Sequence, residues 1–168
     1  RNYETNVFEK YNINNLIFNS DPLISKKGLN NNYNFVIKNV NSDTQNSSGF
    51  KENENFYLSG LFQFNSSLPL IKEINSYKKI LKPKISLKIS PENTKDLSSD
   101  NDHRIDVNNI FNLDRLSVSD TVEGGLSLAY GSDYTIFDNV KNREVFSLKL
   151  ANNLRLNENK DLPQNNQL

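Results

Sequence analysis

The chain has 168 residues, with 20 basic and 20 acidic side chains, one histidine and no cysteine. The zero net charge argues against a nucleic-acid-binding surface, which needs a basic excess, and the lack of cysteine excludes disulfides and thiolate metal sites in this segment. Since the sequence begins at Arg1 and contains no methionine, we expect it to be an excerpt or a processed form of a longer protein.

The first half of the chain holds three segments in which apolar and polar residues alternate, the period of a β-strand with one apolar face. Residues 7–18 are the first, interrupted by Asn14-Asn15, and residues 33–40 are the second. Residues 56–65 follow, with Phe56, Leu58, Phe62 and Phe64 on one side. These segments predict three strands.

The second half repeats the alternation more strongly. In residues 81–90, apolar side chains at the odd positions face one way and Lys82, Lys84 and Lys88 the other. Residues 122–137 and 145–156 show the same pattern, with small residues on the polar side of the first. Six strands of roughly the 9–11 residues that cross a bilayer at a tilt are therefore predicted.

The connections between these strands are unequal in length. Residues 138–144 form a short polar turn, whereas residues 41–55 and 91–121 are long and polar. Strand alternation places both long connections at the same end of the sheet, a distribution typical of outer-membrane barrels. Within 91–121, Ile110 and Leu113 recur at helical spacing, so we expect one helical turn in Asp106–Leu116.

Alternation by itself fits a soluble β-sandwich as well as a membrane barrel, because each wets one face. No apolar run approaches the roughly 20 residues of a membrane-spanning helix. The strand lengths, the small residues on the polar side and the unequal loops favour the barrel. We predict an all-β fold over 1–168, with antiparallel strands forming an arc of a large outer-membrane β-barrel, an external loop at 91–121 and Lys82, Lys84 and Lys88 facing the lumen.

Residues suited to bond chemistry are sparse. His103 lies among Asp100, Asp102 and Asp106, which is a metal site or a His–Asp pair on one interpretation and a solvated polar loop on the other, the more common case. No P-loop, dinucleotide fingerprint or nucleophile elbow is present. We therefore predict no catalytic, cofactor-binding or metal-binding residues and no enzymatic activity.

Three segments in the second half carry a family resemblance. Asn108–Gly131 reads NNIFNLDRLSVSDTVEGGLSLAYG, Pro83–Pro91 reads PKISLKISP, and Asn157–Pro163 reads NENKDLP. In order and spacing they resemble the LptD (organic solvent tolerance) family of lipopolysaccharide-assembly outer-membrane proteins, of the alphaproteobacterial type. The resemblance covers roughly half the chain, and residues 1–80 match only in character.

The resemblance implies a very large barrel in the cell outer membrane that inserts lipopolysaccharide into the outer leaflet. It also implies a lipoprotein plug within the barrel and a periplasmic bridge that delivers lipopolysaccharide. The family's periplasmic N-terminal domain and paired cysteines have no counterpart in this sequence. A generic porin-like channel and a soluble β-sandwich binding module are the alternatives.

The motif positions that match the family are expected to be structural. Arg115 is expected to pair with Asp120 or Glu123 and to pin the long loop against the barrel wall. The full set of family-type residues is Asp106, Asn109, Arg115, Asp120, Glu123, Gly124 and Gly125.

Overall fold

The computed structural model describes residues 6, 8–46, 56–91, 96–99, 103–118, 121–157 and 159–163. All regular structure within these residues is β-strand. The strands are β1 (Phe8–Asn19), β2 (Leu23–Ile24), β3 (Asn30–Gln45), β4 (Tyr57–Ser67), β5 (Leu70–Ile74), β6 (Tyr77–Ser90), β7 (Gly125–Asp138) and β8 (Arg143–Arg155). In this described part of the chain, no helix is long and apolar enough to cross a membrane.

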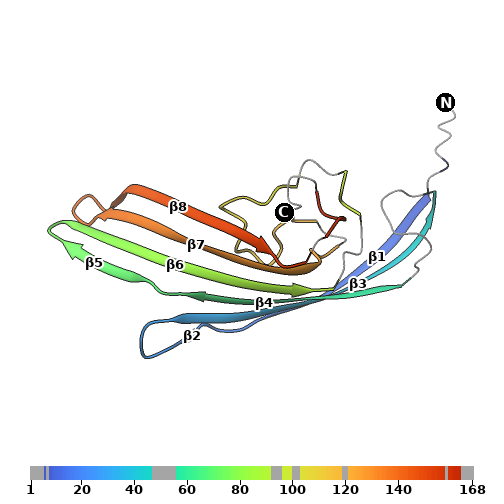
Figure 1. The fold of residues 1–168 in the computed structure, drawn as a ribbon, viewed down its shortest axis with the longest axis horizontal. Coiled ribbons are helices and arrows are strands. Elements are labelled where there is room, and N and C mark those ends of the chain that lie inside the picture. The colour runs from blue at the N-terminus through green and yellow to red at the C-terminus, as the bar shows by residue number, and fades with distance from the viewer. Residues whose placement is uncertain are drawn as a thin grey trace.

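The strands form one open, curved antiparallel sheet in the order β1-β3-β4-β6-β7-β8 (Figure 1). β2 extends the pairing of β1 with β3, and β5 extends the pairing of β4 with β6. Ser67 pairs with Lys84 and Leu70 pairs with Leu81, so β4 and β5 keep one register. The break between them contains Pro69, which has no N–H to donate to a strand ladder. The predicted all-β, antiparallel fold is confirmed.

Short turns gather at one end of the sheet. They comprise residues 25–29, 75–76 and 139–142, and Asn139 N–H donates to the Ser76 carbonyl across two of them at 2.8 Å. Asn75 and Asn142 adopt positive φ angles of 53° and 48°, a conformation that asparagine tolerates in turns. The longer connections leave from the opposite end, as strand alternation predicted.

The observed strands differ from the sequence expectation in several places. β3 extends through residues 41–45, which we had placed in a connection, and β5 and the start of β6 occupy residues between 66 and 80. Their apolar–polar alternation is too irregular to indicate a strand. β1 continues through Asn14, whose side chain donates to the Asn39 side chain across the strands at 3.1 Å. β7 begins at Gly125 instead of 122, because Gly125 has φ +96° and interrupts the extended backbone.

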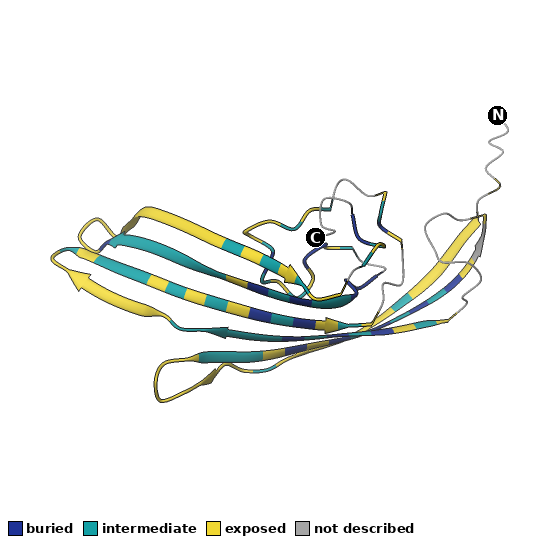
Figure 2. Cartoon of the chain, viewed as in Figure 1, coloured by how far each residue is buried: buried dark blue, intermediate teal, exposed yellow. Residues whose placement is uncertain are grey.

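The two faces of the sheet have opposite chemistry, and in its central strands, near the long connections, they also differ in exposure. Strand register puts Leu16, Ile85 and Leu150 on an apolar face, and these side chains are exposed, Leu150 by 61%. The other, polar face carries Gln63 and Lys88, which are buried, Gln63 completely. Figure 2 shows buried positions alternating with exposed ones along the strands. Water-soluble sheets usually bury the apolar face instead.

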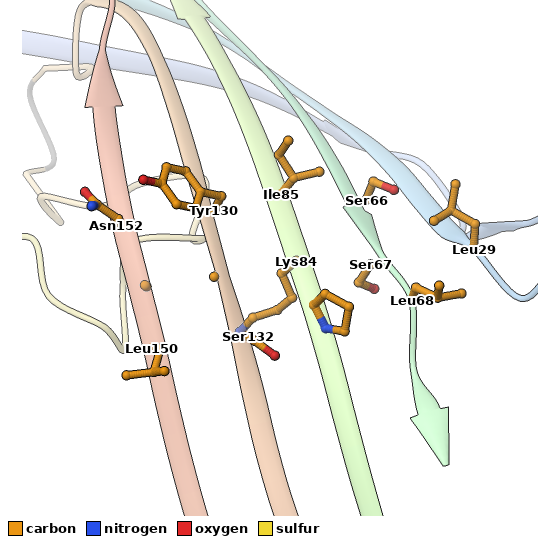
Figure 3. A pocket seen from close by; sticks show the side chains of 13 residues that line it. Leu29, Ser66, Ser67, Leu68, Lys84, Ile85, Tyr130, Ser132, Leu150 and Asn152 are labelled. Carbon is orange, nitrogen blue, oxygen red and sulfur yellow. The ribbon is translucent and has the colours of Figure 1, made fainter. Parts of the chain in front are cut away.

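The apolar face is not smooth. A groove of about 630 Å³ runs between Leu68, at the β4–β5 break, and Leu150 on β8 (Figure 3). Ser66, Pro83 and Ser132, which are short side chains on this face, contribute to its lining. The groove therefore follows from small residues between larger apolar ones.

Candidate functional site

The polar face is covered at one end by a cap, which we define as residues 103–118 and 121–124. The cap lies on the concave side of the sheet, at the end opposite the short turns (Figures 1 and 2). Gln63 of β4 holds it there: its side-chain amide donates to the Phe111 carbonyl at 3.0 Å and to the Ser86 hydroxyl at 2.9 Å. Asn34 of β3 donates to the Gln63 side-chain oxygen at 3.0 Å. The fully buried Gln63 amide is thus satisfied by polar partners on β3 and β6 and by a backbone carbonyl of the cap.

Arg115 is the central residue of the contact between cap and sheet, and it is 1% exposed. Its Nε donates to Glu123 Oε2 at 2.7 Å, and its Nη2 donates to Glu123 Oε1, so the pair is bidentate. The remaining guanidinium hydrogens reach two strands, with Nη1 donating to Asn153 Oδ1 and Nη2 to Ser127 Oγ, each at 2.8 Å. Arginine suits this position because its planar fork matches a carboxylate and still has donors to spare.

Two further cations surround the same carboxylate. Arg155 Nη2 lies 3.0 Å from Glu123 Oε1, and Lys88 Nζ lies 3.8 Å from Glu123 Oε2. Lys88 also donates to the Leu113 carbonyl of the cap. The buried Glu123 carboxylate therefore binds Arg115 within the cap and links the cap to β6 through Lys88 and to β8 through Arg155. We call Lys88, Arg115, Glu123 and Arg155 the clamp.

The environment of Glu123 keeps it ionised. Burial acts to raise the pKa of this carboxyl, but the hydrogen bonds and charge of Arg115 act in the opposite direction, with smaller contributions from Lys88 and Arg155. The net result is a pKa below the ordinary glutamate value. Removing one partner of a buried pair of this kind typically costs about 3–5 kcal/mol, because a charge is left buried without compensation.

Asp106 and Asn109 shape the outer part of the cap. The Asp106 carbonyl accepts from the Ile110 N–H at 3.0 Å, which is one helical turn at the place where the sequence indicated it. The Asp106 carboxylate accepts from the Asn108 N–H at 2.7 Å, and Asn109 Oδ1 accepts from the Asp106 N–H at 2.8 Å. These reciprocal contacts resemble a helix cap and satisfy backbone donors that would otherwise be unpaired.

Gly124 and Gly125 join the cap to β7. Gly125 has φ +96°, a conformation that side chains other than glycine's rarely adopt, and its N–H donates to the Pro91 carbonyl at 3.2 Å. The Gly124 carbonyl accepts from Asn159 Nδ2 at 3.1 Å. Asp120, the alternative partner predicted for Arg115, lies outside the described residues.

The segment after β8 packs against the start of the long loop. Leu97, Leu116 and Leu162 form a small buried apolar cluster, and the Leu97 N–H donates to the Asp161 carbonyl at 2.7 Å. The structure thus brings together the three segments that carry the family resemblance, Pro83–Pro91, Asn108–Gly131 and Asn157–Pro163, although up to 80 positions separate them in the sequence.

Sequence reasoning missed part of this site. Lys88 and Arg155 were recognisable as charged residues on the polar side of a strand, but nothing in the sequence assigned them to Glu123. Gln63 and Asn153 carried no signal, since buried and exposed amides look alike in a strand. Within the described residues, no group of three or more histidine or acidic side chains is placed to hold a metal ion, and Asp100 and Asp102 lie outside those residues.

The clamp contains no nucleophile paired with a base. Its ion pairs and hydrogen bonds hold the cap on the sheet. Comparison of the sequence with known protein families identifies the family of this chain. The sequence model described as LptD, LPS transport system D, matches residues 16–168. The chain belongs to the LptD family. Searches among curated proteins and among solved structures gave no significant match. Membership in LptD makes this chain part of a lipopolysaccharide transport family, which is not a family of enzymes; the alphaproteobacterial subtype stays a prediction from the sequence.

Proposed function

We propose that this chain is an arc of an LptD barrel in the outer membrane, where it takes part in inserting lipopolysaccharide into the outer leaflet. The observation that carries the proposal is the inverted exposure of the sheet. Its apolar face is open, while its polar face is buried beneath the cap at one end. A lipid environment stabilises an open apolar face, and a polar lumen accommodates charged side chains such as Lys84.

The free edges of the sheet support the same proposal. Among the residues that the structure describes, β1 and β8 pair on one side only, and an unpaired strand edge in lipid leaves backbone groups without partners. Closure with further strands of the same barrel satisfies those groups. In this arrangement the short turns face the periplasm and the connections between β3 and β4 and between β6 and β7 face outward.

Lipopolysaccharide, an outer-membrane lipoprotein plug and a periplasmic bridge are the partners we propose from family membership. The transfer moves an amphiphile and breaks no bond. The porin-like alternative has less support, because the match to LPS transport system D covers residues 16–168. The soluble sandwich has less support because a sandwich would cover the apolar face.

Depletion of the full-length parent protein tests the proposal. The expected result is outer-membrane fractionation with heat-modifiable gel mobility, together with loss of surface-exposed lipopolysaccharide on depletion. Outer-membrane location with unchanged surface lipopolysaccharide would indicate a porin-like channel. A protein that fractionates without membrane or detergent would overturn the barrel.

A further inference from the structure

The half of the polar face nearest the short turns is not covered by the cap, and its charge is unbalanced. Lys82 of β6, Asp133 of β7 and Lys149 of β8 lie in one row across three neighbouring strands. Lys84 Nζ lies 2.7 Å from Asp133 Oδ2. Lys84 pairs with Asp133, and Lys82 and Lys149 flank the same residue by register, so these four residues carry two more positive than negative charges.

Two of these lysines are held at the rim of the cap. Lys84 Nζ lies 4.4 Å from the centre of the Phe111 ring, and Lys149 Nζ donates to Asn108 Oδ1 at 3.3 Å. Both partners belong to the cap and neither carries a charge. The lysines are therefore positioned without being neutralised by the cap.

The row beside Asp133 is nearly free of side chains. Gly131 and Ala151 are directly paired across β7 and β8, next to Lys84 on β6. A Cβ at Gly131 would lie 2.2 Å from the Leu150 carbonyl oxygen, so the close approach of the two strands requires glycine. The polar face beside Asp133 is therefore made of small residues, with Lys84 next to them on β6.

We propose that Lys82, Lys84 and Lys149 bind the anionic groups of the lipopolysaccharide headgroup as it passes along the polar face. This inference rests on the proposed function. Neighbouring strands are about 4.8 Å apart, so Lys82 and Lys149 attach to the sheet roughly 10 Å apart. That separation suits a saccharide with several phosphate or carboxylate groups better than one free phosphate ion, and each ammonium group contributes charge-assisted hydrogen bonds to such oxygens.

The test uses the full-length parent protein in its own outer membrane. A photocrosslinking amino acid at Ser147, two positions from Lys149 on the same face, is expected to give a covalent adduct with native lipopolysaccharide. The double variant Lys82→Gln/Lys149→Gln is expected to lower adduct yield by about tenfold or more, since two charge-assisted contacts are lost.

A matched control removes the same charge from the opposite face. Lys72 and Lys79 pair across β5 and β6 and belong to the apolar face by register, so Lys72→Gln/Lys79→Gln is expected to leave the Ser147 adduct unchanged. Heat-modifiable mobility confirms that each variant has assembled. Equal adduct yields in the two assembled double variants, or no adduct at Ser147 in the parent background, would overturn the inference.

The outcomes also separate this inference from the function on which it rests. Loss of surface lipopolysaccharide on depletion, with an adduct insensitive to Lys82 and Lys149, would remove the anion site and leave the transport role. Unchanged surface lipopolysaccharide on depletion would remove the transport role itself. Full competition of the adduct by inorganic phosphate would assign the lysines to a free anion and contradict a headgroup site.

Discussion

The two faces of this sheet are built from the same strands but differ in what covers them. On the apolar face, many leucine, isoleucine and phenylalanine side chains are exposed. On the polar face, the cap buries Gln63, Lys88 and Ser127 with their hydrogen-bonding groups. The difference teaches that polar, directional contacts hold the cap on the sheet, while the apolar face is left to the surroundings.

The largest expected effect comes from removing the charge that holds the polar face closed. Glu123→Gln leaves Lys88, Arg115 and Arg155 close together without a carboxylate, and a broken buried pair costs about 3–5 kcal/mol. We expect the cap to open while β6, β7 and β8 remain paired. Hydrogen exchange of residues 103–118 in the assembled parent protein measures this opening.

Glu144→Gln is the control for that variant, because Glu144 is an exposed residue of β8 and an exposed charge contributes little to stability. Equal exchange in the two variants would mean that the clamp does not hold the cap.

The next effect tests the apolar face directly. Leu148→Arg places a charge on that face near the middle of β8, and in a barrel this costs about 2–4 kcal/mol at the midplane of the bilayer. Ser147→Arg, the adjacent residue on the polar face, is expected to change stability by about 0.5 kcal/mol or less. The urea midpoint of the parent protein in lipid vesicles measures both. A similar loss in the two variants would contradict a lipid-facing apolar side.

A third, smaller effect concerns the close approach of β7 and β8 at Gly131. Gly131→Ala puts a Cβ 2.2 Å from the Leu150 carbonyl oxygen, and the shift needed to relieve such overpacking costs about 1–3 kcal/mol. In Gly60→Ala the nearest atom is 3.6 Å away, an ordinary contact. Comparison of their urea midpoints separates steric crowding from the general effect of replacing glycine.

The smallest effect is a pH dependence of the clamp. The pKa of Glu123 is lower in the folded protein than its ordinary value, so its stabilising contribution is fully present above about pH 4.3 and is lost as pH falls through the folded-state pKa. Hydrogen exchange of the cap, corrected for intrinsic rates, should be flat near neutral pH and rise in acid. Glu123→Gln should remove the rise in acid. A rise near neutral pH in the unsubstituted protein would contradict a lowered pKa of Glu123.

Much of the fold was predictable because alternation is a local property. The pattern in residues 81–90 indicated both a strand and the face on which Lys84 and Lys88 lie. Irregular stretches were less predictable: β5 and the extension of β3 lack a clean alternation, and their strand conformation depends on the neighbouring strand that supplies the hydrogen bonds, β6 for β5 and β1 for the extension of β3. The start of β7 was displaced by the backbone conformation of Gly125, which the Gly124-Gly125 pair did not reveal.

The sequence by itself determined the β-strand architecture, the two chemically distinct faces and the three motif segments that pointed to the LptD family. Only the tertiary structure decided which face is covered and which of the charged residues meet. Arg115 can reach Glu123 through its own loop, but its contact with Asn153 and the approach of Arg155 and Lys88 depend on strand register across β6, β7 and β8. Register is a property of paired strands, so a pattern read along one strand does not contain it.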